Sequence, residues 1–329
     1  MSTFKDLSPK ETATRLLEIE NPIIYVHKRP DADAVGSGCA LCEIFRQLGK
    51  SASLLSEDPI PERLRFITDE LDVSFSRDTE GKTPIAIDVA SPSQLGDLYG
   101  STPNPILMID HHRVGERFAD GYVDPDASSA AEALLDIVSV LENMGKISLT
   151  KRLAYALFAA ISSDTGCFAY SNATAKAHRC AARLIETGID FSDINHKLFT
   201  SKSKNQIRAE GYIASKIESD GTGRVAFATL SLGEIKQLGL NHESFETAID
   251  VVRSLYGCEI AFVIKETESG KFKASLRSTG ADVASVAAKF GGGGHIRAAG
   301  CTPIAENIEK AKDLVLLEIL KMQDQDGKN

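Results

Sequence analysis

Over its first half, the chain alternates short apolar runs with stretches of helical periodicity, and this alternation constrains the fold more than any other feature. Four runs have the length and composition of strands: NPIIYVH (21–27), KSASLLSE (50–57), TPIAIDVA (83–90) and NPILMIDHH (104–112). Apolar residues recur at helical spacing in four further stretches: 36–48, 130–141, 151–161 and 173–186. Strands that alternate with helices are typical of a parallel sheet. We therefore predict an α/β domain whose parallel sheet has helices on both faces.

A second pattern begins after Gly188. The next stretch is polar and charged, which predicts a linker with a connecting helix. Beyond it, apolar and polar residues alternate as in half-buried strands, with helical stretches between and after these segments. We predict three parts: an N-terminal domain over 1–188, the linker over 189–219, and a smaller C-terminal α/β domain over 220–329.

The net charge of the chain is −9, with an isoelectric point near 5.4. Proteins that grip long nucleic acid through its phosphates present a basic face instead, so we expect no long duplex as partner. A small anionic partner is compatible, because bound divalent cations would reverse the local field. No apolar run is long enough to span a bilayer, and the N-terminus lacks the pattern of a secretory signal. We expect a soluble, cytoplasmic protein with no membrane partner.

Two of the six cysteines, Cys39 and Cys42, form a CxxC motif. A redox pair or a zinc site is one interpretation. The motif lies in the helical stretch GSGCALCEIF, however, and no second CxxC or cysteine-histidine cluster accompanies it. Packing of small side chains in a buried helix is the favoured interpretation.

Acidic and imidazole side chains come directly after three of the four apolar runs. In open parallel sheets, ligands bind beyond the carboxyl ends of the strands, so these side chains should meet at one place. The residues are His27, Asp31 and Asp33 after the first run, Asp88 in the third, and Asp110, His111 and His112 in the fourth, with Asp164 added from the end of a helical stretch.

Such a cluster requires cations. Two carboxylates about 4 Å apart repel by roughly 4 kcal/mol at an effective dielectric constant of about 20. Oxygen and imidazole donors without thiolate suit divalent ions such as manganese and magnesium. The donors are too many for one ion, whereas two ions about 3.5–4 Å apart can share a carboxylate and promote displacement at phosphorus. Any one of these residues alone fits a solvated loop or a helix cap, but the set favours a two-metal site.

The same residues also resemble the motifs of a known family. HKRPDADAVGS, AIDVAS, IDHH and SSDTGCF, in that order, resemble the four motifs of the DHH phosphoesterase superfamily. GGGGHIRAAG, at Gly291–Gly300, resembles the glycine-rich signature of the DHH-associated C-terminal domain. Together these motifs cover nearly the whole chain. Its size and domain content resemble those of the bacterial nanoRNases that also act as pAp phosphatases.

The resemblance implies a role for each motif residue. Asp88 would bridge two ions, for which manganese is expected, with magnesium or cobalt as alternatives. His112 would contact the scissile phosphate or protonate the leaving oxygen, and Asp110 would orient the histidine pair. The implied metal ligands are His27, Asp31, Asp33, Asp88, His111 and Asp164.

Four consecutive glycines are costly to order, so a packed domain should use them where backbones approach closely or φ is positive. No Lys-Ser or Lys-Thr follows them, which excludes a P-loop. One interpretation is a flexible turn, and the other is that backbone N–H groups hold a substrate phosphate. The second interpretation and the family resemblance give as candidate substrate-binding residues Arg113, Arg277, Ser278, Gly293, Gly294, His295 and Arg297.

The resemblance implies hydrolysis of very short single-stranded RNA or DNA oligonucleotides and of 3'-phosphoadenosine 5'-phosphate (pAp). A soluble phosphodiesterase for linear or cyclic dinucleotides is the alternative. Family II pyrophosphatases have another type of C-terminal domain, and RecJ-type exonucleases are larger. A non-catalytic nucleotide-binding or metal-storage protein with the same fold is a further alternative, which retention of all six implied ligands disfavours. Whether the chain forms a homodimer is left open.

Overall fold

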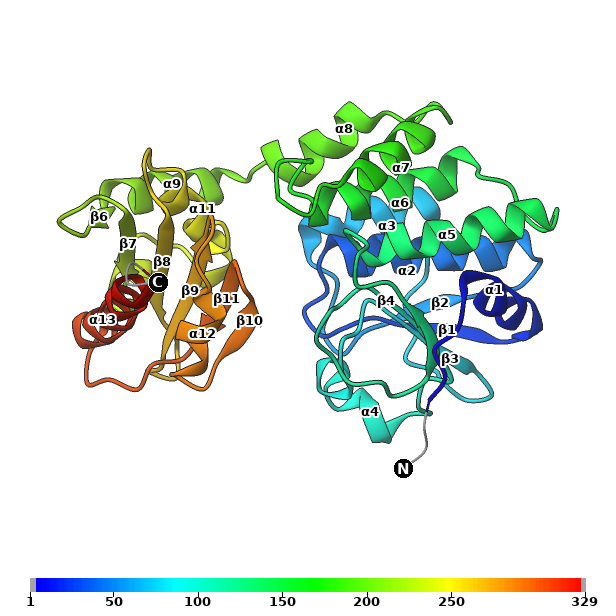
Figure 1. Ribbon diagram of the computed structural model, residues 1–329, viewed down its shortest axis with the longest axis horizontal. Helices are drawn as coiled ribbons and strands as arrows, with labels where there is room; N and C mark the ends of the chain where they lie inside the picture. Colours follow the sequence, from blue (N-terminus) through cyan, green and yellow to red (C-terminus); the bar gives the residue numbers. More distant parts are fainter. Residues whose placement is uncertain (1–3, 327–329) are drawn as a thin grey trace. The chain divides into compact units, whose positions relative to one another are not determined.

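The computed structural model of the protein describes residues 4–326, apart from the side chains of His295 and of residues 324–326. The chain divides into two compact units, Met1–Ser201 and Lys202–Asn329 (Figure 1). Each unit has its own sheet and its own hydrophobic core. The mixed α/β class predicted from the sequence is confirmed.

The sheet of the first unit has five parallel strands in the order β2-β1-β3-β4-β5. The strands are β1 (Pro22–Tyr25), β2 (Ser53–Leu55), β3 (Thr83–Ile87), β4 (Leu107–Asp110) and β5 (Asp120–Val123). The first four lie in the predicted runs, whereas β5 has the sequence DGYV, which contains no apolar run. Since β1, β3 and β4 are neighbours, their carboxyl ends meet at one edge of the sheet.

Alternate side chains of these strands face two different layers. Ile85 and Ile87 of β3 belong to the main core, while Ala86 between them belongs to a smaller one. The long helices α2 (Ala32–Gln47), α5 (Ala130–Asn143) and α6 (Lys151–Asp164) cover the face of the main core (Figure 1). The short helices η2 (Pro92–Leu95) and α4 (Leu98–Ser101) lie over the other face. Helices therefore lie on both faces, as predicted, but unequally.

Further helices complete the first unit. Helix α1 (Pro9–Glu18) is amphipathic and buries Ala13 and Leu16, although its sequence is mostly polar. The bounds of these helices are α1 (Pro9–Glu18), η1 (Glu62–Leu64), α3 (Arg65–Leu71), α7 (Ala175–Ile185), α8 (Phe191–Asn195) and η3 (His196–Thr200).

The division between the units falls at Ser201, within the linker predicted over 189–219. Helix α8 buries Ile194 in the core of the first unit. Helix α9 (Lys204–Ser215) buries Ala209 and Ile213 in the second unit. The polar surface of this stretch suggests a linker, while a few buried side chains attach its two halves to different cores.

The second unit has a six-stranded sheet in the order β10-β11-β9-β8-β7-β6, in which β7 and β8 pair parallel and the other neighbours antiparallel. Its strands are β6 (Glu218–Ser219), β7 (Val225–Leu230), β8 (Ile260–Glu266), β9 (Phe272–Ser278), β10 (Gly293–His295) and β11 (Ala298–Cys301). Its helices besides α9 are α10 (Leu232–Gln237), η4 (His242–Phe245), α11 (Ala248–Arg253), α12 (Val283–Ala288) and α13 (Ile308–Asp326). Helices α12 and α13 contribute to one core of this unit, and α9, α10 and α11 to the other.

Two expectations concern parts of the chain outside the candidate site. Within residues 4–326, no helix combines the length and apolar character that a membrane crossing needs. Cys39 and Cys42 are free thiols buried in α2, and burial raises the pKa of both. Their position agrees with the packing interpretation of the CxxC motif.

Candidate metal centre

The candidate site lies beyond the carboxyl ends of β1, β3 and β4. Asp31 is the N-cap of α2, and its Oδ1 accepts hydrogen bonds from the backbone N–H groups of Asp33, at 3.0 Å, and of Ala34, at 3.1 Å. Asp88 follows β3 directly and has a φ of 57°, a left-handed conformation that is unfavourable for most non-glycine residues. Such strain concentrates at functional sites, because the surrounding structure must hold it.

Three sets of three side chains each offer donor atoms within 4.8 Å of one another, and one of them is Asp88, His111 and His112. The other two contain only predicted metal ligands. The first triad is His27, Asp31 and Asp88, and the second triad is Asp33, His111 and Asp164. All six predicted metal ligands thus lie together, although they are far apart in the sequence.

Asp88 joins the two triads through its two carboxylate oxygens. Its Oδ2 lies 3.6 Å from Nε2 of His27, and its Oδ1 lies 3.6 Å from Nε2 of His111. The same Nε2 of His111 lies 3.6 Å from Oδ2 of Asp164 and 3.8 Å from Oδ2 of Asp33. One carboxylate therefore faces both triads, as a ligand shared by two ions must.

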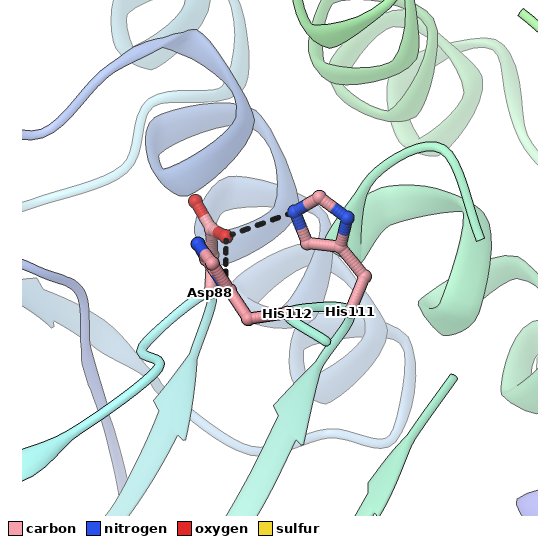
Figure 2. Close-up of side chains that lie close together, drawn as sticks. All are labelled: Asp88, His111 and His112. Atoms are coloured by element: carbon pink, nitrogen blue, oxygen red, sulfur yellow. Dashed lines mark ion pairs between the residues drawn. The ribbon is translucent and has the colours of Figure 1, made fainter. Parts of the chain in front are cut away.

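His112 lies beside the second triad and is tied to a different carboxylate. Its Nδ1 is 2.7 Å from Oδ1 of Asp110, a residue only 2% exposed. Its ring lies 4.8 Å from the ring of His111, and its Nδ1 is 3.8 Å from Oδ1 of Asp88. Figure 2 shows both histidines beside the Asp88 carboxylate. Because Nδ1 bonds Asp110, any contact of His112 with a phosphate would be made by Nε2.

The ionisation of the cluster reflects its crowding. Burial opposes the charged form of His27, but contacts with Asp31 and Asp88 outweigh it and raise the pKa of His27 to about 11. Burial likewise opposes protonation of His111, but contact with Asp88 and attraction to Asp33 help raise its pKa to about 11. Burial would raise the pKa of Asp88, but His111 and His27 hold it below its ordinary value.

Two other carboxylates shift in the opposite direction, because burial outweighs their attraction to His111. Burial, with repulsion from Asp88 and Asp164, raises the pKa of Asp33 well above its ordinary value. Burial also raises the pKa of Asp164 to about 7, with added repulsion from Asp31 and Asp88. Four carboxylates are thus crowded into one cluster with two histidines, and divalent cations would relieve their repulsion. Oxygen and imidazole donors fit such ions, and none of the three donor groups around Asp88 and His111 contains a thiol.

The N-terminus of α5 has a role that the sequence leaves undefined. Its serines can cap a helix and, if that helix faced the site, the helix end could bind phosphate. In the structure, its backbone N–H groups at Ala130 and Ala131 donate to the carboxylate of Asp33, at 2.7 and 3.2 Å. These amides therefore hold a candidate metal ligand. The capping pattern in DPDASSAAE identifies the helix end, but the pairing with Asp33 depends on packing between α2 and α5.

Most of the candidate substrate-binding residues gather around the β9–β11–β10 edge of the second unit. Ala298 of β11 pairs with Arg277 of β9, and the N–H group of Ser278 donates to the carbonyl of Arg297 at 3.0 Å. Nη1 of Arg277 donates to the carbonyl of Leu276, and the hydroxyl of Ser278 donates to the carbonyl of Ala281. The backbone of His295 belongs to β10, while its side chain lies outside the described residues.

Arg113 lies in the first unit, directly after the histidine pair. Its guanidinium is exposed and forms an ion pair with Asp126 at 2.6 Å. This is the ordinary arrangement of a loop arginine.

The glycine run forms a strand and the turn before it. A side chain at Gly292 would place Cβ 2.1 Å from the carbonyl oxygen of Gly300. Gly294 has a φ of 143°, and a Cβ there would lie 2.5 Å from the carbonyl oxygen of Ala298. Close backbone packing against β11 therefore accounts for these two glycines. Gly293 has open space where its Cβ would be, so packing gives no reason for glycine there.

Comparison with known proteins agrees with this architecture. The model of the DHH family N-terminal domain matches residues 21–161, and that of the DHHA1 domain matches residues 222–321. A relative from Thermus thermophilus, named bifunctional oligoribonuclease and PAP phosphatase NrnA, is 30% identical over 306 residues, which are 92% of this chain and 90% of that protein. The cyclic-di-AMP phosphodiesterase GdpP of Geobacillus thermodenitrificans is 27% identical over 305 residues, which are 85% of this chain and 44% of that protein.

Solved structures show the same fold. An exopolyphosphatase-related protein from Bacteroides fragilis superposes with a TM-score of 0.86 at 22% identity, covering 95% of this chain and 96% of its own. RecJ from Thermus thermophilus, solved in complex with Mn²⁺, superposes with a TM-score of 0.54 at 16% identity, covering 93% of this chain and 54% of its own. With a relative of 30% identity over nearly its full length and both domain models matched in order, the chain belongs to the DHH phosphoesterase family, and its second unit carries the DHHA1 domain.

Proposed function

We propose that this protein uses two divalent metal ions to hydrolyse phosphate esters in very short oligonucleotides and in pAp. The observation that carries this proposal is the position of Asp88, whose Oδ2 faces His27 of the first triad and whose Oδ1 faces His111 of the second. The similarity to the Thermus thermophilus oligoribonuclease and PAP phosphatase, over 92% of the chain, supports the choice of substrates.

The two triads define which residues would hold each ion. His27, Asp31 and Asp88 would bind the first ion, and Asp33, His111 and Asp164, together with Asp88, the second. When bound, the ions would polarise the phosphate and activate a water molecule at neutral pH. The donors suit manganese, magnesium or cobalt. We favour manganese, since a RecJ that shares the fold was solved with that ion.

The histidine and carboxylate beside the triads would act on the substrate. Asp110 fixes the ring of His112 through Nδ1, so that Nε2 would contact the phosphate or give a proton to the leaving oxygen. A buried carboxylate that accepts from Nδ1 also sets the tautomer of the ring.

The second unit would bind the rest of the substrate. Its candidate residues offer two guanidinium groups, which suit phosphates, and backbone N–H groups in a glycine-rich strand. The acidic chain lacks a basic track for long nucleic acid, so a short substrate is favoured. These residues are Arg277, Ser278, Gly293, Gly294, His295 and Arg297, with Arg113 contributed by the first unit.

Linear or cyclic dinucleotides are the second candidate class of substrate. The similarity to the cyclic-di-AMP phosphodiesterase GdpP favours them, although this chain spans less than half of that protein. The cytoplasmic location stays a prediction, and whether the chain forms a homodimer stays open.

A substrate panel tests the proposal. The purified protein is assayed on dinucleotides, pAp, cyclic dinucleotides and pyrophosphate, each with Mn²⁺ and with a chelator. We expect turnover of dinucleotides and pAp that the chelator abolishes. Turnover of cyclic dinucleotides alone would support the second candidate, and inactivity on every nucleotide with metal present would overturn both.

A further inference from the structure

Every ligand of the second triad is linked, directly or through Asn172, to one short segment, residues 127–131, which contains the start of α5. Nδ1 of His111 lies 3.4 Å from the carbonyl oxygen of Ala127. The N–H groups of Ala130 and Ala131 donate to Asp33. Nδ2 of Asn172 donates to two carbonyls, that of Ser128 at 3.1 Å and that of Asp164 at 3.0 Å.

The first triad is built differently. Among the residues that the structure describes, His27, Asp31 and Asp88 make no hydrogen bond to the 127–131 segment. A change in this segment should therefore affect the two ions unequally.

The buried Glu132 binds the 127–131 segment through Ser128. Glu132 is 0% exposed, and its Oε2 accepts from the N–H of Ser128 at 3.2 Å and from its hydroxyl at 2.5 Å. Its Oε1 accepts no hydrogen bond among the described residues and lies 3.6 Å from Nζ of Lys176. An isolated buried carboxylate is strongly unfavourable, so the lysine is what allows a charged group at this position.

Lys176 is itself held from three sides. Its Nζ lies 3.1 Å from Oδ2 of Asp124 and 2.9 Å from Oδ2 of Asp136, in addition to its ion pair with Glu132. Asp124 in turn donates its backbone N–H to the carbonyl of Asp110, which precedes the histidine pair. The lysine of α7 thus connects the start of α5 with the loop that follows β4.

We propose that Glu132 and Lys176 are positioning residues for the second of the two ions. The pair fixes the 127–131 segment, and this segment holds Asp33, His111 and Asp164 at ion-binding distance. Loss of either charge loosens the second triad and leaves the first intact. This inference rests on the two-ion site proposed above.

A calorimetric titration of the metal-free, full-length protein with Mn²⁺ alone tests the role of Glu132 and Lys176. We expect two binding steps for the wild type, of which Asp164→Asn identifies the one that belongs to the second triad. Partner residues behind metal ligands typically contribute about 10–100-fold to affinity. We therefore expect Glu132→Gln and Lys176→Met to weaken Mn²⁺ binding at the second triad by about 10–100-fold and to leave binding at the first unchanged. Lys176→Arg keeps the positive charge, so we expect it to retain most of the wild-type affinity.

Arg183→Met is the matched control. Arg183 also joins α7 to α5, through Glu142 and Ser139, and its side chain is 36% exposed, as is that of Lys176. It lies toward the other end of α5, away from the 127–131 segment. The control should keep both binding steps.

Asn172→Ala covers the case in which a buried-charge variant does not fold. Asn172 is only partly buried, and its removal cuts the link between Ser128 and Asp164 without stranding a charge. It should weaken the second step alone. A wild type that binds fewer than two ions would contradict the two-ion site itself. A wild type that binds two ions, with unchanged affinities in the folded variants or equal losses in Arg183→Met, would overturn this inference alone.

Discussion

The two triads of the candidate metal centre differ in how the chain builds them. The first takes two of its members, His27 and Asp31, from one loop, and the side chain of Asp31 is 52% exposed. The second takes its members from three distant stretches, and the side chain of Asp33 is 1% exposed. A local loop can present two ligands together, whereas the second triad requires α2, α5 and α6 to pack correctly first.

The two triads also differ in charge balance. In the first, His27 faces two carboxylates, and its pKa is raised. In the second, His111 faces three carboxylates, and two of these, Asp33 and Asp164, have raised pKa values. The second triad therefore has more unbalanced carboxylates for a cation to neutralise, and we expect its ion to contribute more to the stability of the fold.

Removing the carboxylate of Asp88, which the two ion sites would share, should affect both sites and cause the largest loss of activity. Asp88→Asn keeps the shape of the side chain and tolerates a positive φ, but it weakens both ion sites. Metal ions supply several kcal/mol of charge stabilisation in such reactions, so we expect kcat on a dinucleotide to fall by about 10³-fold or more. Steady-state kinetics measures it, with the exposed Asp97→Asn as control. A kcat close to that of the wild type would contradict a bridging role.

Asp33→Asn should separate the triads by removing a buried ligand. One ion at 100 times its dissociation constant stabilises a protein by about 2.7 kcal/mol. We expect saturating Mn²⁺ to stabilise the variant by about one such increment less than it stabilises the wild type. Melting curves with and without Mn²⁺ measure this gain. If Mn²⁺ stabilised the variant as much as the wild type, the second triad would bind no ion.

Asp31→Asn is the corresponding change in the first triad. Asparagine is as good an N-cap as aspartate, so α2 should remain intact. The charge of an exposed ligand is partly screened by water, and we expect a smaller loss of Mn²⁺-dependent stability than in Asp33→Asn. The same melting curves decide it. A larger loss in Asp31→Asn would reverse the proposed order of the two sites.

Cys39→Ala should have the smallest effect, because neither triad uses a thiol. Removing one buried sulfur atom should lower the free energy of unfolding by about 1 kcal/mol. Both Mn²⁺ binding steps should be unchanged in a calorimetric titration. Loss of either Mn²⁺ binding step would show that the CxxC motif takes part in metal binding.

The sequence was sufficient to predict the parts of the site that depend on strand ends. The runs before His27, Asp88 and His111 are strongly apolar, and in a parallel sheet their carboxyl ends must lie at one edge. Both the sheet and the gathering of the ligands beside these strand ends follow from that pattern, whereas Asp164 lies at the end of α6 and is not accounted for by it. The strand β5 carries no apolar run, and the hairpin β10–β11 is built largely from small residues, so neither gives a periodic signal.

The attachments behind the ligands were not predictable from the sequence. Asp33 binds the end of α5 across 97 residues, and Lys176 reaches Glu132 from another helix. Such contacts depend on how helices pack, which local patterns do not encode. The exact point of division within the predicted linker could not be predicted for a similar reason, since single buried residues such as Ile194 decide to which core a polar segment belongs.

The most direct test of the account is anomalous diffraction from crystals grown with Mn²⁺. The account predicts two manganese peaks about 3.5–4 Å apart, with one oxygen of Asp88 on each ion, His27 on the first and His111 on the second. A single peak, or two peaks that do not share Asp88, would contradict it.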